Sequence, residues 1–149
     1  MDATALVAIV VLSVVGFLIA SYIHSKNTRG ETLVCPIGSD CTKVVTGEYS
    51  TVFGVPIVVT GMFYYSFNIA IYCAVIAFAP LQASIFTLML ALVATGSFIF
   101  SLYLTFVQAV IIRKWCTWCL GSAIITIFIF CLAISRIDFD VVALIRQWI

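Results

Sequence analysis

The sequence predicts an all-α integral membrane protein, a four-transmembrane-helix bundle with a cysteine-bearing loop capping one end. The 149 residues are 64% hydrophobic and only 9% charged, which leaves too few polar residues for the surface of a soluble domain. Four apolar runs are each long enough to cross a membrane, since about 20 helical residues span a hydrocarbon core of about 30 Å. Two cysteine pairs beside the connecting segments single out the capping loop. A single membrane domain, residues 1–149, is expected.

The first apolar run, residues 4–23, is followed by a long polar segment, residues 24–53. The run has neither a basic start nor a cleavage site of small residues, so we expect a retained helix rather than a signal peptide. The polar segment carries charges of both signs and contains no repeat, which favours an ordered cap loop over a disordered linker.

The cap loop contains the first cysteine pair, Cys35 and Cys41. Turn-forming residues lie between the two cysteines, so a disulfide between them is within geometric reach. Ser39 or Asp40 is expected to cap a short helix that stops at Gly47. Cys41 would then stand at a helix N-terminus.

The three remaining spans are expected at residues 54–79, 83–112 and 116–135. Pro56 falls in the first turn of the second span, where a missing N–H costs little. The tail, residues 136–149, mixes charged with apolar residues. It is expected to extend the fourth helix or to lie along the membrane interface.

Several residues in or beside the spans have ordinary structural interpretations. Cys73 and Cys131 lie inside apolar runs and are expected to be small buried hydrophobic side chains. Gln108 is expected to form an interhelical hydrogen bond rather than to act in catalysis. Trp115 and Trp118 are typical of the aromatic belt at a membrane interface.

The second cysteine pair, Cys116 and Cys119, opens the fourth span directly after Arg113 and Lys114. A helix N-terminus carries unsatisfied N–H groups and partial positive charge, which favour a thiolate. The two basic residues are expected to add positive charge at Cys116. Cys119 should lie on the same helix face, about 4.5 Å deeper along the axis. Such a pair suits a two-electron relay between an aqueous thiol and a lipid-soluble acceptor.

Four spans place the first and third connecting segments on the same side of the membrane, so the two cysteine pairs can meet. The positive-inside rule compares Lys and Arg in the short loops on the two sides. It turns the cysteine side toward the cytoplasm, where an ordinary reducing cytosol disfavours disulfides. The residues counted are Lys26, Arg29, Lys43, Arg113 and Lys114 on the cysteine side against Arg136 and Arg146 on the other. No basic run indicates nucleic-acid binding.

Three interpretations of the four loop cysteines remain open on residues alone. A four-thiolate zinc site is disfavoured because one pair opens a membrane helix rather than a small polar fold. Two static structural disulfides account for the pairs but not for the deeper position of Cys119. A relay of two exchanging disulfides accounts for the pairs, their shared side and the setting of Cys116.

Nearly the whole chain resembles the vitamin K epoxide reductase (VKOR) family, in its short prokaryotic form without a fused thioredoxin-like domain. The resemblance rests on the cysteine pair after the first helix, on the stretch Ser50-Thr-Val-Phe-Gly-Val-Pro56, and on Cys116-Thr-Trp-Cys119-Leu-Gly-Ser-Ala123. In the other four-helix quinone-linked disulfide generators, those of the bacterial periplasmic Dsb pathway, the Cys-x-x-Cys pair comes first. Here it comes second.

The resemblance implies a membrane thiol-disulfide oxidoreductase whose helices surround a quinone, menaquinone or ubiquinone. Cys35 would exchange with a thioredoxin-like partner, Cys41 would shuttle electrons to Cys116, and Cys119 would face the quinone. The enzyme would thereby generate protein disulfides, and its cysteines would lie on the extracytoplasmic side of the cell membrane. The alternative is a non-enzymatic, multi-pass membrane scaffold with static disulfides.

The residues expected near the quinone match the family pattern only in part. Six residues after the shuttle cysteine the family often has Ser or Thr, where this chain has Gly47. Thr46, beside it, is the candidate replacement. Ser50 and Phe53 match positions near the quinone in relatives, and a capping loop would also bury both.

Overall fold

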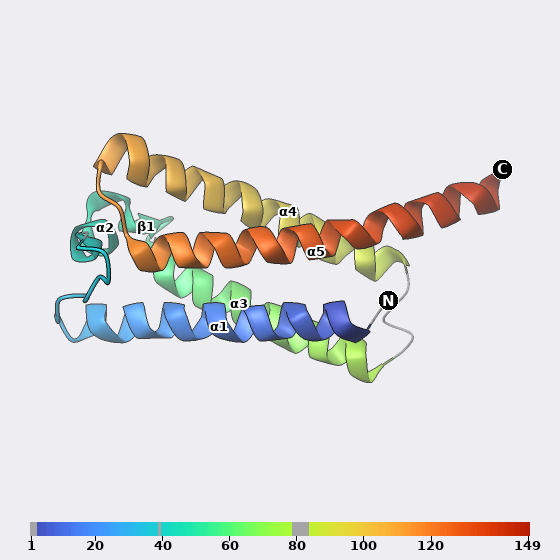
Figure 1. The fold of residues 1–149 in the computed structure, drawn as a ribbon, viewed down its shortest axis with the longest axis horizontal. Helices are drawn as coiled ribbons and strands as arrows, with labels where there is room; N and C mark the ends of the chain where they lie inside the picture. Colours follow the sequence, from blue (N-terminus) through green and yellow to red (C-terminus); the bar gives the residue numbers. More distant parts are fainter. Residues whose placement is uncertain (1–2, 39, 79–83) are drawn as a thin grey trace.

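The computed structural model describes residues 3–38, 40–78 and 84–149. Four long helices dominate this part of the chain: α1 (Ala3–Thr28), α3 (Ile57–Ala77), α4 (Ser84–Phe106) and α5 (Thr117–Trp148). They run side by side as an elongated bundle (Figure 1). Each is long and apolar enough to cross a membrane. The predicted four-transmembrane-helix bundle is therefore confirmed.

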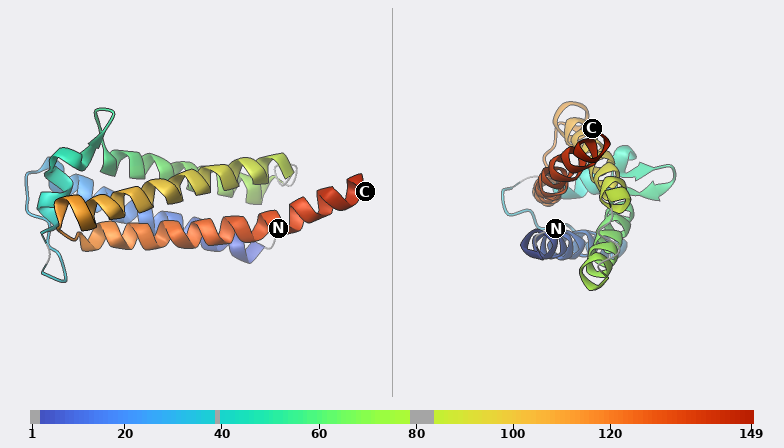
Figure 2. Two further views of the ribbon diagram at one scale, coloured as in Figure 1. Left: turned by 90° about the horizontal axis from the view of Figure 1, so that it is seen from above. Right: turned by 90° about the vertical axis from the view of Figure 1, so that its right-hand side faces the viewer.

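The bundle is built from two helix pairs. α1 packs along α3, α4 packs along α5, and α1 also contacts α5. The end-on view in Figure 2 shows the helices grouped around a common axis. Apolar side chains from all four helices meet in one buried cluster, formed by Leu6, Ile9, Tyr65, Tyr72, Val75, Leu90, Ile125 and Ile129.

Tyr65 is the side chain that joins three of the helices. Its ring lies directly over Gly16 of α1, where an added Cβ would be 2.4 Å from two ring atoms. Its hydroxyl is 2.7 Å from Ser122 Oγ and 3.3 Å from Thr126 Oγ1, both on α5. The glycine therefore lets the ring approach α1 while the hydroxyl holds α5.

The second span begins later than predicted because its expected first residues form a hairpin. β1 (Thr51–Val52) pairs antiparallel with β2 (Val55–Pro56). Gly54 turns the chain with φ 80°, a conformation that glycine adopts without steric cost. Pro56 accordingly precedes α3 rather than lying within it. The predicted break at residues 80–82 lies outside the described residues.

The cap consists of the hairpin, α2 (Cys41–Thr46) and the 3₁₀ turn η1 (Glu48–Ser50). It covers the end of the bundle where α1 ends and where α3 and α5 begin (Figure 1). The short helix is confirmed, and Gly47 follows its last residue. The predicted cap by Asp40 is wrong, because its side chain makes no capping hydrogen bond and pairs with Lys114 instead. The alternative cap, Ser39, lies outside the described residues. At the opposite end α5 continues through the tail, which realises the first of the two predicted alternatives.

Candidate functional site

The two cysteine pairs lie together where α2 of the cap meets the start of α5. Cys41 and Cys116 belong to the same hydrophobic cluster, with 1% and 0% of their surfaces exposed. Cys35 and Cys119 are partly buried and pack against this cluster. The structure thus brings together the four cysteines that the sequence singled out.

The first pair forms a disulfide, Cys35–Cys41, with a Cα–Cα distance of 6.2 Å. Gly38, with φ 63°, turns the chain between the two cysteines. Cys41 is the first residue of α2 and is buried, whereas Cys35 is only half-buried. Cys35 is therefore the sulfur of this pair that a molecule in solution reaches first.

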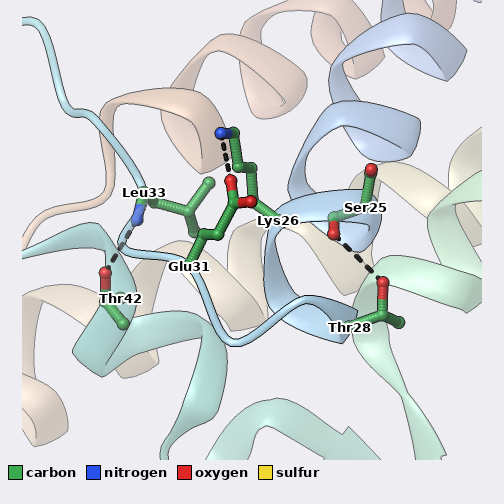
Figure 3. A network of polar contacts seen from close by, with 6 residues as sticks. All are labelled: Ser25, Lys26, Thr28, Glu31, Leu33 and Thr42. Carbon is green, nitrogen blue, oxygen red and sulfur yellow. Dashed lines mark hydrogen bonds and ion pairs between the residues drawn. The ribbon is translucent and has the colours of Figure 1, made fainter.

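The cap loop is anchored by polar contacts to the helices on either side (Figure 3). The Leu33 N–H donates to Thr42 Oγ1 of α2 at 3.1 Å. Lys26 near the end of α1 pairs with Glu31 of the loop. These contacts fix the approach to Cys35, which follows two residues after Leu33.

Two contacts join the cap loop to the first turn of α5 and to the segment before it. The Trp118 indole N–H donates to the Val34 carbonyl at 3.0 Å, and its ring packs against Tyr22. Lys114 Nζ lies 2.8 Å from Asp40 Oδ2, and the hydrogen bond and charge of Lys114 lower the pKa of the Asp40 carboxyl. Trp118 is thus a structural contact between the two cysteine segments, beyond the predicted membrane-belt role.

The second pair consists of two thiols, Cys116 and Cys119. Cys116 is the N-cap of α5, and its Sγ accepts the Cys119 backbone N–H at 3.3 Å. The pKa of the Cys116 thiol is lowered, chiefly by a hydrogen bond from the Cys119 side chain and also by the Cys119 and Trp118 backbone N–H groups, although burial opposes this. The predicted helix-terminal setting is confirmed.

The sequence predicted that Arg113 and Lys114 add positive charge at Cys116, and the structure contradicts this prediction. Lys114 is paired with Asp40, and Arg113 is exposed in a left-handed conformation with φ 53°. Neither contributes to the lowered pKa of Cys116. The prediction for these two residues was wrong, because the fold directs Lys114 to a carboxylate on the cap loop.

A cavity of about 430 Å³ lies inside the bundle below α2, within the size range of small-molecule sites. Its wall is mostly apolar, with contributions from all four long helices. Among the four loop cysteines, Cys119 alone lines it. The apolar side chains of the wall include Ile19, Ile23, Val45, Val58, Val93, Phe100 and Leu104.

The structure separates the three predicted quinone contacts. Ser50 lines the cavity. Thr46 is exposed and donates its hydroxyl to the Thr42 carbonyl at 2.7 Å, away from the cavity wall. Phe53 sits at the hairpin turn with φ 52° and is fully exposed, so its expected burial was wrong. The hairpin explains this, because its turn projects from the cap instead of folding over the bundle.

Gly47 occupies the position where the family often has Ser or Thr. A Cβ added there would lie 2.9 Å from the Lys43 backbone oxygen. A side chain at this position therefore requires the end of α2 to shift. Glycine at this position, where the family often has Ser or Thr, therefore agrees with the close approach of the Lys43 carbonyl oxygen.

Gln108 is the polar residue whose place in the site the sequence did not predict. It lies in the π-helical turn η3 (Val107–Ile112), which continues α4. Its side chain lines the cavity, and its Oε1 accepts the Cys116 backbone N–H at 3.4 Å. The predicted hydrogen bond is present, and its partner is the backbone of Cys116, the N-cap of α5. The feature of the sequence that could have indicated this place in the site was a polar amide side chain within an apolar run.

Cys73 and Cys131 take no part in the site. Both are exposed on the outside of the bundle, so their predicted burial against protein was wrong. In a membrane, an apolar residue on this face contacts lipid, and its sequence context looks the same as that of a core residue. Within residues 3–38, 40–78 and 84–149, no group of three or more His, Cys, Asp or Glu side chains is arranged to hold a metal ion.

Comparison with known families adds one match. The family model described as the vitamin K epoxide reductase family, VKOR, matches residues 7–134. The matched range includes all four loop cysteines and the residues that line the cavity. No curated protein matches the chain.

Proposed function

The chain belongs to the vitamin K epoxide reductase family of membrane oxidoreductases, and we propose that it oxidises a thioredoxin-like dithiol protein and delivers the electrons to a lipid quinone. The observation that carries this proposal is the graded setting of the four sulfurs. Cys35 is half-buried at the cap surface, Cys41 and Cys116 share a buried cluster, and Cys119 lines the apolar cavity. This order leads from water to the interior of the membrane.

The first exchange takes place at the cap. A thiolate of the partner attacks Cys35, the Cys35–Cys41 bond breaks, and Cys41 leaves as a thiolate. The second thiol of the partner then attacks its own sulfur in the mixed disulfide, which releases Cys35 and leaves the partner oxidised. Exposed Val34 and Ile37 beside Cys35 favour a protein partner over a small thiol.

The second exchange takes place in the buried cluster, with Cys116 and Cys119 in their disulfide form. The Cys41 thiolate attacks Cys116, the Cys116–Cys119 bond breaks, and Cys119 leaves. Cys35 then attacks Cys41 and releases Cys116, so that the Cys35–Cys41 disulfide is restored. Two electrons have moved inward, and the low pKa of Cys116 makes it the better leaving group of the mixed disulfide.

The cavity fits a quinone ring, because it is apolar, of suitable volume, and lined at one place by Cys119. A bound quinone would take up the two electrons and two protons of the Cys116–Cys119 dithiol. Ser50 and Gln108 are polar wall groups suited to its carbonyl oxygens. Cys116 is buried from water, and Cys119 would supply the reacting sulfur nearest to the acceptor.

The test is quinone reduction by the purified protein with reduced thioredoxin as electron donor. We expect Cys35→Ala, Cys41→Ala, Cys116→Ala and Cys119→Ala each to abolish the reaction. Cys73→Ala and Cys131→Ala are the matched controls and should retain it, since both cysteines lie on the outer face of the bundle. Full activity after replacement of all four loop cysteines would falsify the proposal.

A static scaffold makes the opposite prediction about exchange. In the relay, a reduced thioredoxin variant that keeps only its attacking cysteine displaces Cys41 from the Cys35–Cys41 disulfide and has no second thiol to release itself from Cys35. The mixed disulfide should therefore accumulate and be visible on a non-reducing gel. If no such species forms with this thioredoxin variant, the disulfides do not exchange and the scaffold is the better account.

The side of the membrane determines which thiols the enzyme oxidises. Cys35 can be labelled in intact cells with a membrane-impermeant maleimide after mild reduction, with Cys73 and Cys131 replaced. Labelling before permeabilisation assigns the relay to the extracytoplasmic side, as the family implies. Labelling that requires permeabilisation assigns it to the cytoplasm, as the count of Lys and Arg implies.

A further inference from the structure

Three of the hydroxyl groups on the cavity wall are committed to the protein itself. Ser97, Thr105 and Thr126 each donate to a backbone carbonyl three or four residues earlier in their own helix, at 2.9, 2.9 and 3.0 Å. A hydroxyl has a single hydrogen, so these three groups have no donor left for a ligand.

Gln108 differs from these hydroxyls. Its Oε1 accepts the Cys116 N–H at 3.4 Å, while the two hydrogens on its Nε2 meet no partner among the described residues. The residue is only 6% exposed and its side chain lines the cavity. The Nε2 donor therefore faces the cavity, where a ligand with an acceptor oxygen would complete the pairing of this amide.

The position of Gln108 assigns this donor to the redox end of the cavity. Cys116 is the N-cap of α5, and Cys119 lies on the cavity wall one turn further along the same helix. Because the side-chain amide is a rigid plane, the bond from the Cys116 N–H to Oε1 also fixes the orientation of Nε2.

Tyr64 is a wall residue whose buried hydroxyl has no hydrogen-bond partner among the described residues. It precedes Tyr65, whose hydroxyl bonds to Ser122 and Thr126, one and two turns deeper in α5 than Cys119. Tyr64 therefore belongs to a deeper level of the bundle. Gln108 lies at the level of the reacting sulfur, because it bonds to the N-cap of α5.

We propose that Gln108 donates a hydrogen bond from Nε2 to a carbonyl oxygen of the quinone ring beside Cys119. The inference rests on the proposed quinone-linked function and names the residue that orients the ring. One side chain would then hold both the backbone of Cys116 and the electron acceptor.

Binding of two ring probes tests this role without turnover. The probes are a dimethylated naphthoquinone and the corresponding dimethylnaphthalene, which has the same rings and no carbonyl. Dissociation constants are measured by fluorescence in nanodiscs, with empty nanodiscs correcting for partition into lipid. In Gln108→Met we expect the constant for the quinone to rise about 3- to 10-fold, the effect of one neutral hydrogen bond, and that for the naphthalene to stay unchanged.

Two further variants make the comparison decisive. Thr95→Val removes a hydroxyl on α4 that bonds to the Ala91 carbonyl and lies outside the cavity wall, so it should affect neither probe. If Gln108→Met does not fold, Gln108→Glu decides by the same comparison, because a carboxyl group keeps an oxygen for the Cys116 N–H.

The outcomes separate the two claims. A selective loss of quinone binding supports the role of Gln108. Equal changes for both probes, or none, overturn that role and leave the quinone-linked function standing. Equal dissociation constants of the wild-type protein for the quinone and the naphthalene would show that the carbonyl groups add no affinity, and this result also overturns the role of Gln108. A wild-type protein that binds neither probe overturns the proposed function, and this inference with it.

Discussion

Lys114 Nζ lies 2.8 Å from Asp40 Oδ2, so an ion pair joins the residue before Cys41 to the segment that leads into Cys116. Both side chains are about half exposed. An exposed ion pair contributes little to global stability, but this one connects the two segments whose cysteines must exchange. Its effect should therefore be found in the rate of transfer between the two pairs.

We expect Lys114→Ala and Asp40→Asn each to slow transfer from the outer to the inner cysteine pair by about two- to fivefold, the range typical of an exposed pair. Rapid-quench trapping of the four thiols with an alkylating reagent measures this rate. The exchanged pair Asp40→Lys with Lys114→Asp should restore it in part, and high salt should diminish the wild-type advantage.

Lys43→Ala is the matched control for the ion pair, since Lys43 Nζ is 3.5 Å from the same carboxyl and is more exposed. The pKa of Asp40 is lowered, mainly by Lys114, so the pair is intact at neutral pH. It is lost only as the pH falls through this lowered pKa. Rates that are equal in wild type, Lys114→Ala and Lys43→Ala would show that the ion pair does not position the relay.

The lowered pKa of Cys116 gives a second prediction. In the reduced protein, the thiolate absorbance of Cys116 should develop at a pH below the ordinary value of 9.0. Cys119→Ala removes the hydrogen bond that contributes most to this shift, so the titration midpoint should move to higher pH. Ultraviolet titration of wild type against Cys116→Ser isolates the signal. A midpoint in Cys119→Ala equal to that of wild type would contradict the assigned cause.

Gly16→Ala should destabilise the bundle by about 1–3 kcal/mol, the usual cost of overpacking a filled core. The added methyl would lie 2.4 Å from the ring of Tyr65, which is 1% exposed and cannot move aside freely. Gly121→Ala, where a Cβ meets nothing within 4 Å, is the control and should be neutral or slightly stabilising. Unfolding in mixed micelles measures both. Equal stability of the two variants would refute the close packing of α1 on Tyr65.

Tyr65→Phe should cost about 0.5–1.5 kcal/mol, because it removes the hydroxyl that bonds to Ser122 across α3 and α5. Ser122→Ala removes the other side of the same contact. If the hydrogen bond couples the two helices, the double variant should lose less stability than the two single variants together. Full additivity in the same unfolding measurement would argue against the coupling.

The predictions that succeeded depend on local properties of the chain. The four spans follow from the lengths of apolar runs, and the short cap helix ends before Gly47 as expected. The predictions that failed concern the direction in which a side chain faces. Cys73 and Cys131 face outward because lipid-facing and protein-facing residues are equally apolar. Phe53 is exposed because the hairpin turn that holds it projects from the cap instead of folding over the bundle.

The contacts that shape the site were the least accessible to prediction. Gln108 and Cys116 are eight residues apart, yet their bond depends on a π-helical turn and on the left-handed Arg113. The ion pair of Asp40 with Lys114 joins two loops that the sequence could place only on a common side of the membrane. Apolar pattern and residue spacing carry no information about either contact.

The sequence by itself determined the bundle, the end at which the two cysteine pairs meet, and the chemistry available there. The reason is that an apolar run of sufficient length has to cross the bilayer, and each crossing moves the chain to the other side. The tertiary structure alone decided that Cys119 faces a cavity rather than lipid, that Cys41 and Cys116 share one buried cluster, and that Gln108 holds Cys116. These relations depend on how side chains from distant helices pack, and packing is a property of the folded bundle.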